Sequence, residues 1–301
     1  MSLWRNLGLA LDTWGGRARM QRFRDRPAAE DVAFHRTGLV QYRYRERSGP
    51  TPDSPTIVFA ADPPATVEFY DEVLDVFGSH FRVVVFELPA MGFSATEGRY
   101  RFGFRETNDD VADFLRAVAG EGAVLAFSCV ATLAALDIAA RYPELVSHLI
   151  LIQGGSVEAF DRWKAARDPK GILAKPVVGQ MIMKRIAPER MPAWYHISTG
   201  SRERMPEFCA CAKHTLEDGA LWSLASAYQV YMDPGVVLPS PTQPVLGIWG
   251  VADGSHPEGN AELCEGVMGG DFVRLEGLGH APEVEAPDEV LPFVLDFLEA
   301  N

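Results

Sequence analysis

Three residue types that together activate a hydroxyl nucleophile lie far apart in this chain of 301 residues: Ser128, Asp253 and His280. A serine hydroxyl is a weak nucleophile until an imidazole takes its proton during attack. The imidazole in turn needs a buried carboxylate, which fixes its tautomer and stabilises its charged form. We therefore take Ser128 as the candidate nucleophile, His280 as the base and Asp253 as the acid that orients the base.

The position of Ser128 supports this interpretation. A run of five apolar residues, 123–127, leads directly into Ser128, and helical spacing of apolar residues follows. A sharp turn from strand to helix would lift the side chain above the carboxyl ends of the strands, where open α/β sheets bind ligands. Each residue also has an ordinary alternative: Ser128 as a helix cap, Asp253 as a turn residue before glycine, and His280 as a loop histidine. We interpret His148 and His256 as structural.

The strands that must position these residues are visible as short apolar runs, each separated from the next by a segment with helical spacing. This alternation is typical of a parallel sheet flanked by helices. Continuous β-branched runs also indicate strands buried on both faces. The runs are "TIVFAA" (56–61), "FRVVVFE" (81–87), "AVLAF" (123–127), "SHLILIQ" (147–153), "PVLGIWG" (244–250) and "DFVRLEG" (271–277).

Four stretches, in this order, resemble the α/β-hydrolase fold family. They are "FELPAMGFS" (86–94), "SCVATLAALDIAARYPELVSHLILI" (128–152), "PVLGIWGVAD" (244–253) and "GLGHAPEVEAPDEV" (277–290). The resemblance implies an α/β fold with a mostly parallel eight-stranded sheet, flanking helices and a helical cap, and it implies the chain order nucleophile, acid, histidine. It divides the chain into an extension (1–34), a core (35–154 and 242–301) and a cap (155–241).

The extension contains Trp4, Leu7, Leu11 and Trp14 at helical spacing, with arginines after them. We expect an amphipathic helix that packs on the core or the cap; docking to a membrane surface or a partner is the alternative. The cap is rich in tryptophan and methionine, which suits an adaptable apolar pocket. Its candidate substrate-binding residues are Trp163, Trp194 and Trp222.

The turn around the nucleophile departs from the pattern that the resemblance implies. Glycine is expected two residues before and after the nucleophile, because strand and helix approach closely there, whereas this chain has Ala126 and Val130. The valine would crowd or widen the turn and offset the nucleophile. The backbone N–H of Cys129 would supply one oxyanion donor, and a catalytic thiol is disfavoured because its side chain should point into the sheet packing.

A second departure follows the run 56–61. The resemblance implies His-Gly and then a residue whose N–H binds the oxyanion, but this chain reads "FAADPP", so Asp62 stands at the second donor. Its carboxylate would oppose a forming oxyanion, and losing one such donor costs about 100- to 1,000-fold in turnover. Asp62 either turns away to cap its loop, binds a polar substrate group, or acts as an acid–base residue in proton-transfer chemistry.

Composition excludes several classes of partner. The net charge of −13 argues against a nucleic-acid-binding protein. Four cysteines without a disulfide-like spacing favour a reducing compartment, and we expect a cytoplasmic protein. The chain has no apolar run of the length that a membrane span needs, about 18 residues. No glycine-rich phosphate loop follows a strand, so we expect no cofactor, and Cys209, Cys211 and His214 do not converge on a metal site.

We therefore expect a serine hydrolase that cleaves a small or medium apolar ester, lactone or thioester. A homo-oligomer is left open. The resemblance also leaves two alternatives: a lyase, isomerase or cyclase that uses Asp62 near the substrate, and a catalytically silent module that binds a small molecule. Dehalogenases and epoxide hydrolases of this fold use an aspartate nucleophile, which position 128 does not provide.

Overall fold

The computed structural model describes residues 3–14, 32–232, 238, 240–268 and 270–301. Within them, one nine-stranded sheet forms the centre of the molecule. Eight strands follow the order β1-β2-β4-β3-β7-β8-β10-β11, and β6 pairs with β2. The strands are β1 (Val32–Thr37), β2 (Val40–Arg47), β3 (Thr56–Ala61), β4 (Arg82–Glu87), β6 (Ala95–Thr96), β7 (Ala123–Ser128), β8 (Val146–Ile152), β10 (Val245–Gly250) and β11 (Asp271–Leu275).

Strand direction confirms the predicted mostly parallel sheet. The neighbours from β4 through β3, β7, β8 and β10 to β11 all pair in parallel, whereas β2 pairs antiparallel with β1, β4 and β6. All residues of β7 and β10 are buried, as their continuous apolar sequences require. Because the strands are parallel, the loops that carry the candidate site residues leave the sheet at one edge.

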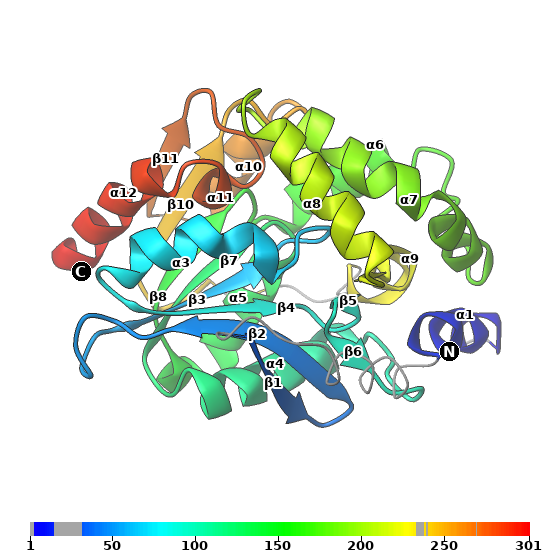
Figure 1. Cartoon of the computed structure of the whole chain (residues 1–301), viewed down its shortest axis with the longest axis horizontal. Helices are drawn as coiled ribbons and strands as arrows, with labels where there is room; N and C mark the ends of the chain where they lie inside the picture. Colours follow the sequence, from blue (N-terminus) through cyan, green and yellow to red (C-terminus); the bar gives the residue numbers. More distant parts are fainter. Residues whose placement is uncertain (1–2, 15–31, 233–237, 239, 269) are drawn as a thin grey trace.

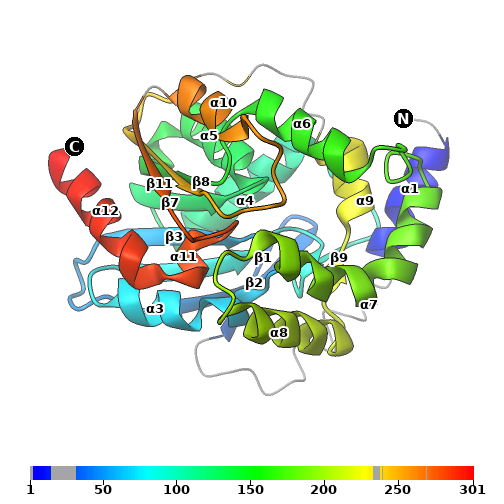
Figure 2. The ribbon, with the colours of Figure 1, turned by 90° about the horizontal axis from the view of Figure 1, so that it is seen from above.

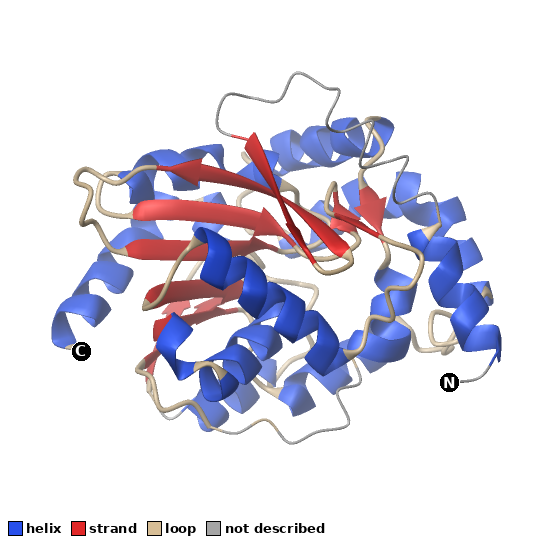
Figure 3. Ribbon diagram, turned by 90° about the horizontal axis from the view of Figure 1, so that it is seen from below, coloured by secondary structure: helices blue, strands red, loops and turns tan. Residues whose placement is uncertain are grey.

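Helices cover both faces of the sheet (Figure 3). Alternate strand residues point to opposite faces: Val58 and Leu125 pack with the cluster of α4 and α5, and Ile57 and Val124 with that of α3 and α12. The two layers thus give the sheet two apolar cores. These helices are α3 (Asp71–Gly78), α4 (Phe104–Val118), α5 (Ala131–Arg141) and α12 (Pro287–Ala300). The shorter helices α10 (Asn260–Met268) and α11 (Pro282–Glu285) contact β10.

Between β8 and β10 the chain forms helices instead of alternating elements. They are α6 (Val157–Arg167), α7 (Val178–Ser198), α8 (Met205–Glu217) and the short α9 (Leu224–Ser226), followed by a π-helical turn, Ala227–Tyr231. Figures 1 and 2 show α6 to α9 gathered at the opposite end of the molecule from α12. A short strand, β9 (Leu221–Trp222), pairs with β5 (Met91–Gly92) of the core. The division into extension, core and cap stays a prediction.

The end of α7 is fastened to the loop that carries His280. The backbone N–H of His280 donates to the carbonyl of Ser198 over 2.6 Å, and that of Gly254 donates to Ile197 over 2.8 Å. A Cβ atom at Gly279 would lie 2.0 Å from the carbonyl oxygen of Ser198, so only glycine permits this approach. The helices over the sheet edge are therefore in direct backbone contact with the site.

The first helix, α1 (Leu3–Thr13), packs on α7 and α9. Leu9 is fully buried, and Asp12 accepts a hydrogen bond of 2.5 Å from the Ser226 hydroxyl. Trp4 and Trp14 are 64% and 79% exposed. The helix thus packs with a face other than the one that the tryptophans mark, and the arginines after it lie outside the described residues. None of the helices in the described ranges combines the length and the apolar character needed to cross a membrane.

Candidate functional site

The turn between β7 and α5 places Cys129 at its tip. Its backbone φ is +49°, a left-handed conformation that is uncommon for any residue except glycine and that recurs at functional sites. The strand ladder extends through Ser128, which pairs with Ile152, and α5 begins at Ala131. The sharp turn from strand to helix therefore centres on residue 129.

Ser128 is the last residue of β7, one residue before the tip of this turn. Ser128 is fully buried, and its hydroxyl donates a 2.6 Å hydrogen bond to Oε1 of Glu283. The prediction that the Cys129 side chain enters the sheet packing is wrong, because Cys129 lines a cavity. Counting from Cys129, the position two residues onward is the small Ala131 but the position two residues before is Phe127, so small residues alone do not distinguish this register from that of Ser128.

His280 and Asp253 lie together beyond the ends of β11 and β10. Nδ1 of His280 is 2.6 Å from Oδ2 of Asp253, whose two oxygens also accept hydrogen bonds from the Gln153 amide, over 2.9 Å, and the Ser255 backbone, over 2.7 Å. Burial alone would raise the pKa of Asp253, but the charge of His280 and these bonds hold that pKa well below its usual range. The structure thus brings the predicted base and acid together.

The carboxylate of Asp62 lies on the other side of the same imidazole. Its Oδ2 is 3.2 Å from Nε2 of His280, and both side chains are almost fully buried. Burial raises the pKa of Asp62, although His280 and Cys129 partly offset this effect. Burial lowers the pKa of His280, but Asp253, Cys129 and Asp62 together raise it well above its usual value. Asp62 therefore faces the site and does not turn away from it.

Neither predicted oxyanion donor is free. The N–H of Cys129 donates to the carbonyl of Ile152 over 2.8 Å, and the backbone of Asp62 is hydrogen-bonded to the Tyr70 hydroxyl. The backbone N–H of Val130, which follows the tip of the turn, instead faces the Cys129 sulfur. Moving the turn by one residue thus moves the candidate donor by one residue as well.

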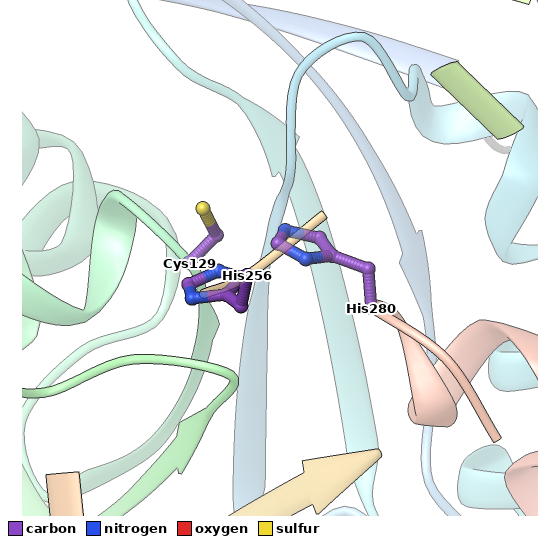
Figure 4. A group of neighbouring side chains, drawn as sticks. All are labelled: Cys129, His256 and His280. Carbon is purple, nitrogen blue, oxygen red and sulfur yellow. The ribbon is translucent and has the colours of Figure 1, made fainter. Parts of the chain in front are cut away.

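His256, interpreted from the sequence as structural, also belongs to this cluster. Its ring stacks on that of His280, with centroids 5.2 Å apart and an interplanar angle of 29°. The sulfur of Cys129 and one ring nitrogen from each histidine lie within 4.8 Å of one another (Figure 4). Burial, and next the charge of His280, lower the pKa of His256 to about 3. Its place three residues after Asp253 was the only sequence signal.

The same three side chains are the group in the described ranges that could surround a metal ion. Cysteine and histidine are ligands that zinc accepts. Cys209, Cys211 and His214 of α8 do not form such a group among the described residues; the Cys209 sulfur instead contacts the Pro192 carbonyl over 3.2 Å and Nε2 of His196 over 3.8 Å.

A cavity opens above Cys129 and Val130. Asp62 is its charged wall, and the hydroxyls of Tyr100 and Tyr231 bind within the protein, to Thr107 over 2.7 Å and to Asn108 over 3.1 Å. The remaining walls are mainly apolar, which suits an apolar ligand. They include Pro63, Leu88, Met91, Phe102, Trp163, Trp194, Leu224 and Met232. The predicted Trp222 is not among them, because it lies in β9, where it pairs with Met91.

Comparison with known proteins supports the fold. The model of the alpha/beta hydrolase family matches residues 57–293. RutD of Pantoea ananatis (strain LMG 20103), which carries the name of a carbamate hydrolase, is 23% identical over 253 residues, covering 82% of this chain and 89% of RutD. A thermophilic esterase from Thermogutta terrifontis shares the fold with a TM-score of 0.67 and 16% identity, covering 89% of this chain and 98% of the esterase. The Cif epoxide hydrolase from Acinetobacter nosocomialis shares it with a TM-score of 0.70 and 13% identity, covering 94% of this chain and 95% of the epoxide hydrolase.

Proposed function

Because the chain belongs to the alpha/beta hydrolase family, we propose that it is a hydrolase whose nucleophile is Cys129, with His280 as the base and Asp253 as the orienting acid. The observation that carries this proposal is the position of Cys129. It stands at the strained tip of the turn, on the floor of an apolar cavity, with its sulfur within 4.8 Å of a ring nitrogen of His280. A thiol at this position replaces the hydroxyl expected of Ser128.

The resting site keeps the thiol neutral. Burial, and next the charge of Asp62, raise the pKa of Cys129 to about 11. His280 is then an imidazolium between two carboxylates and has no capacity to accept a proton. Transfer of its Nε2 proton to Asp62, whose pKa burial raises, gives a neutral imidazole and a neutral carboxylic acid. This transfer prepares His280 to act as a base.

Acylation starts when Nε2 of His280 takes the proton of Cys129. The thiolate attacks the substrate carbonyl carbon, a carbon–sulfur bond forms, and the carbonyl electron pair moves to oxygen near the N–H of Val130. Collapse of this intermediate breaks the bond to the leaving group, which receives the proton from His280. Asp253 holds the ring in the required orientation through its contact with Nδ1.

Deacylation repeats these steps with water. His280 removes a proton from water, the hydroxide attacks the thioester carbon, and collapse releases the carboxylic acid and the Cys129 thiolate. The thiolate then recovers its proton from His280. The apolar walls favour a small or medium apolar ester, lactone or thioester as the substrate. A carbamate, the substrate class in the name of RutD, also presents a carbonyl carbon to the same attack.

Proton-transfer chemistry is a second candidate, and the position of Asp62 favours it. Asp62 lines the cavity, and its Oδ2 lies 3.2 Å from Nε2 of His280, so the two proton-accepting groups are adjacent. Such a pair can remove a proton from one substrate atom and return it to another without an acyl-enzyme. A lyase, isomerase or cyclase of this kind would not need the sulfur of Cys129.

Alkylation with iodoacetamide, mapped by mass spectrometry, and turnover of p-nitrophenyl butyrate test the first candidate. We expect alkylation of Cys129 to abolish turnover and Cys129→Ala to be inactive. Cys264→Ala is the matched control, because Cys264 is equally buried and lies in α10. Retention of turnover by a folded Cys129→Ala variant would contradict the proposal and favour proton transfer by Asp62 and His280.

A further inference from the structure

The orientation of the Asn260 side chain determines where the proton of His256 lies. Asn260 is fully buried at the start of α10, and its amide nitrogen is 2.8 Å from the carbonyl oxygen of Ala159 and 3.1 Å from Nδ1 of His256. A carbonyl oxygen can only accept, so the NH₂ group must face Ala159. Its second hydrogen then points at His256. Nδ1 is therefore the acceptor, and the proton of the neutral ring is on Nε2.

This Nε2–H group is buried and has no hydrogen-bond partner among the described residues. The ring carrying it is held between the edge of Trp249, with centroids 5.1 Å apart, and the stacked ring of His280. A buried donor without a partner loses its hydrogen bond to water and gains none in return. One ring nitrogen of His256 lies within 4.8 Å of the Cys129 sulfur, which makes this sulfur a candidate partner for the buried donor.

A metal ion is another candidate partner for this ring nitrogen, but the tautomer argues against it. A metal would need the lone pair of Nε2, and the proton would have to move to Nδ1. Nδ1 faces the NH₂ group of Asn260, so a proton there would point at another donor. The cluster of Cys129, His256 and His280 fits a hydrogen-bond donor beside a sulfur better than it fits a zinc site.

We propose that His256 is a further catalytic residue, whose neutral imidazole donates its Nε2–H to the sulfur of Cys129 when that sulfur carries negative charge. This inference rests on the proposed function. One ring nitrogen of His256 lies within 4.8 Å of the Cys129 sulfur, and His256 does not line the cavity. When His280 takes the thiol proton, the N–H groups of Val130 and His256 share the stabilisation of the thiolate. A neutral donor is suited to this task, because it does not compete with His280 for the proton.

The decisive variant is His256→Phe, which keeps an aromatic ring in the stack and removes the N–H group. We expect the rate of Cys129 acylation, measured as the p-nitrophenolate burst with p-nitrophenyl butyrate, to fall about 10- to 100-fold, the range for a hydrogen bond to a charged group. The pH at which half the maximal burst rate is reached should rise. His256→Gln supplies another N–H donor and should recover part of the loss. His148→Phe is the matched control, because His148 is also without ring hydrogen bonds but lies in β8.

The outcomes distinguish a failure of the role of His256 from a failure of the proposed function. One outcome is a burst in the parent protein whose rate and pH profile are the same in a His256→Phe variant with unchanged thermal unfolding. That result overturns the role of His256 alone. Inhibition of the parent by micromolar zinc chloride that His256→Phe abolishes also overturns it, because the ring would then be a ligand. If His256→Phe does not fold, the burst rates of His256→Gln and of a folded His256→Leu variant are compared. A His256→Gln rate that is no closer to the parent than the His256→Leu rate overturns the donor role. A burst that persists in Cys129→Ala overturns the proposed function itself.

Discussion

Asp62 faces the ring nitrogen of His280 that the proposed mechanism needs, with Oδ2 of Asp62 3.2 Å from Nε2. Since Asp253 occupies Nδ1 over 2.6 Å, the imidazole lies between two carboxylates. This arrangement stabilises the charged ring and keeps the neighbouring thiol neutral. Reactivity therefore depends on the charge of Asp62, which a substrate in the apolar cavity would reduce further by excluding water.

The first prediction concerns Asp62→Asn. Asp62 raises the pKa of Cys129, and removing its charge should lower that pKa and free Nε2 of His280. We expect the rate of Cys129 alkylation by iodoacetamide at pH 7 to increase by about tenfold or more, since each pKa unit changes the thiolate fraction tenfold. Peptide mapping over a time course measures this rate. An unchanged or slower rate would show that Asp62 does not hold the thiol neutral.

The second prediction contrasts Ser128→Ala with Cys129→Ser. Ser128→Ala should keep kcat for p-nitrophenyl butyrate within about threefold, but it should lower the free energy of unfolding by about 1–3 kcal/mol, because a buried bond to Glu283 is lost. Cys129→Ser should keep the fold and lose most of the turnover. Steady-state kinetics and urea unfolding measure the two effects. The opposite order of activity would return the nucleophile to Ser128.

The third prediction concerns stability and pH. Burial raises the pKa of Glu283 from 4.5 to about 7. The folded state thus binds more protons than the unfolded state between these values, so the stabilisation is complete below pH 4.5 and is lost as the pH rises to 7. We expect Glu283→Gln to flatten the pH dependence of the free energy of unfolding over this interval. Urea unfolding at a series of pH values checks it, and identical slopes in the two proteins would contradict it.

The fourth prediction uses the shape of the cavity. Leu224→Trp adds volume to a wall residue and should raise KM for p-nitrophenyl octanoate about tenfold or more relative to the acetate, since each lost methylene contact changes binding about 10- to 200-fold. Trp222→Phe is the control, because Trp222 does not line the cavity. Kinetics with an acyl series measure the effect, and equal changes for both esters would place the acyl chain elsewhere.

The sequence predicted the features that depend on regular spacing. Apolar runs predicted the strands, their alternation with helices predicted a parallel sheet, and parallel strands bring Asp253 and His280 to one edge. It did not predict which residue stands at the tip of the turn. That choice depends on whether the ladder with β8 ends before or after Ser128, and on the strained backbone of Cys129. A shift of one residue reverses the direction of a strand side chain.

The orientations of the His256 and Asp62 side chains could not be predicted from the sequence for a different reason. The role of His256 depends on the Asn260 amide, which is fixed by a carbonyl in another helix. The direction of Asp62 depends on the charge of His280, more than 200 positions along the chain. Periodicity contains no information on such contacts, because each joins segments that are far apart in the sequence and that only the complete fold brings together.

The hydrogen bond from the His280 backbone N–H to the Ser198 carbonyl links the position of α7 over the cavity to the position of the proposed base. Lifting this end of α7 to admit a bulky ligand would withdraw the carbonyl and let the base shift from its acid. A ligand too large for the closed cavity would therefore disturb the orientation of the base that is needed to convert it. The same hydrogen bond thus couples the size of ligand that the site admits to the geometry of its catalytic residues.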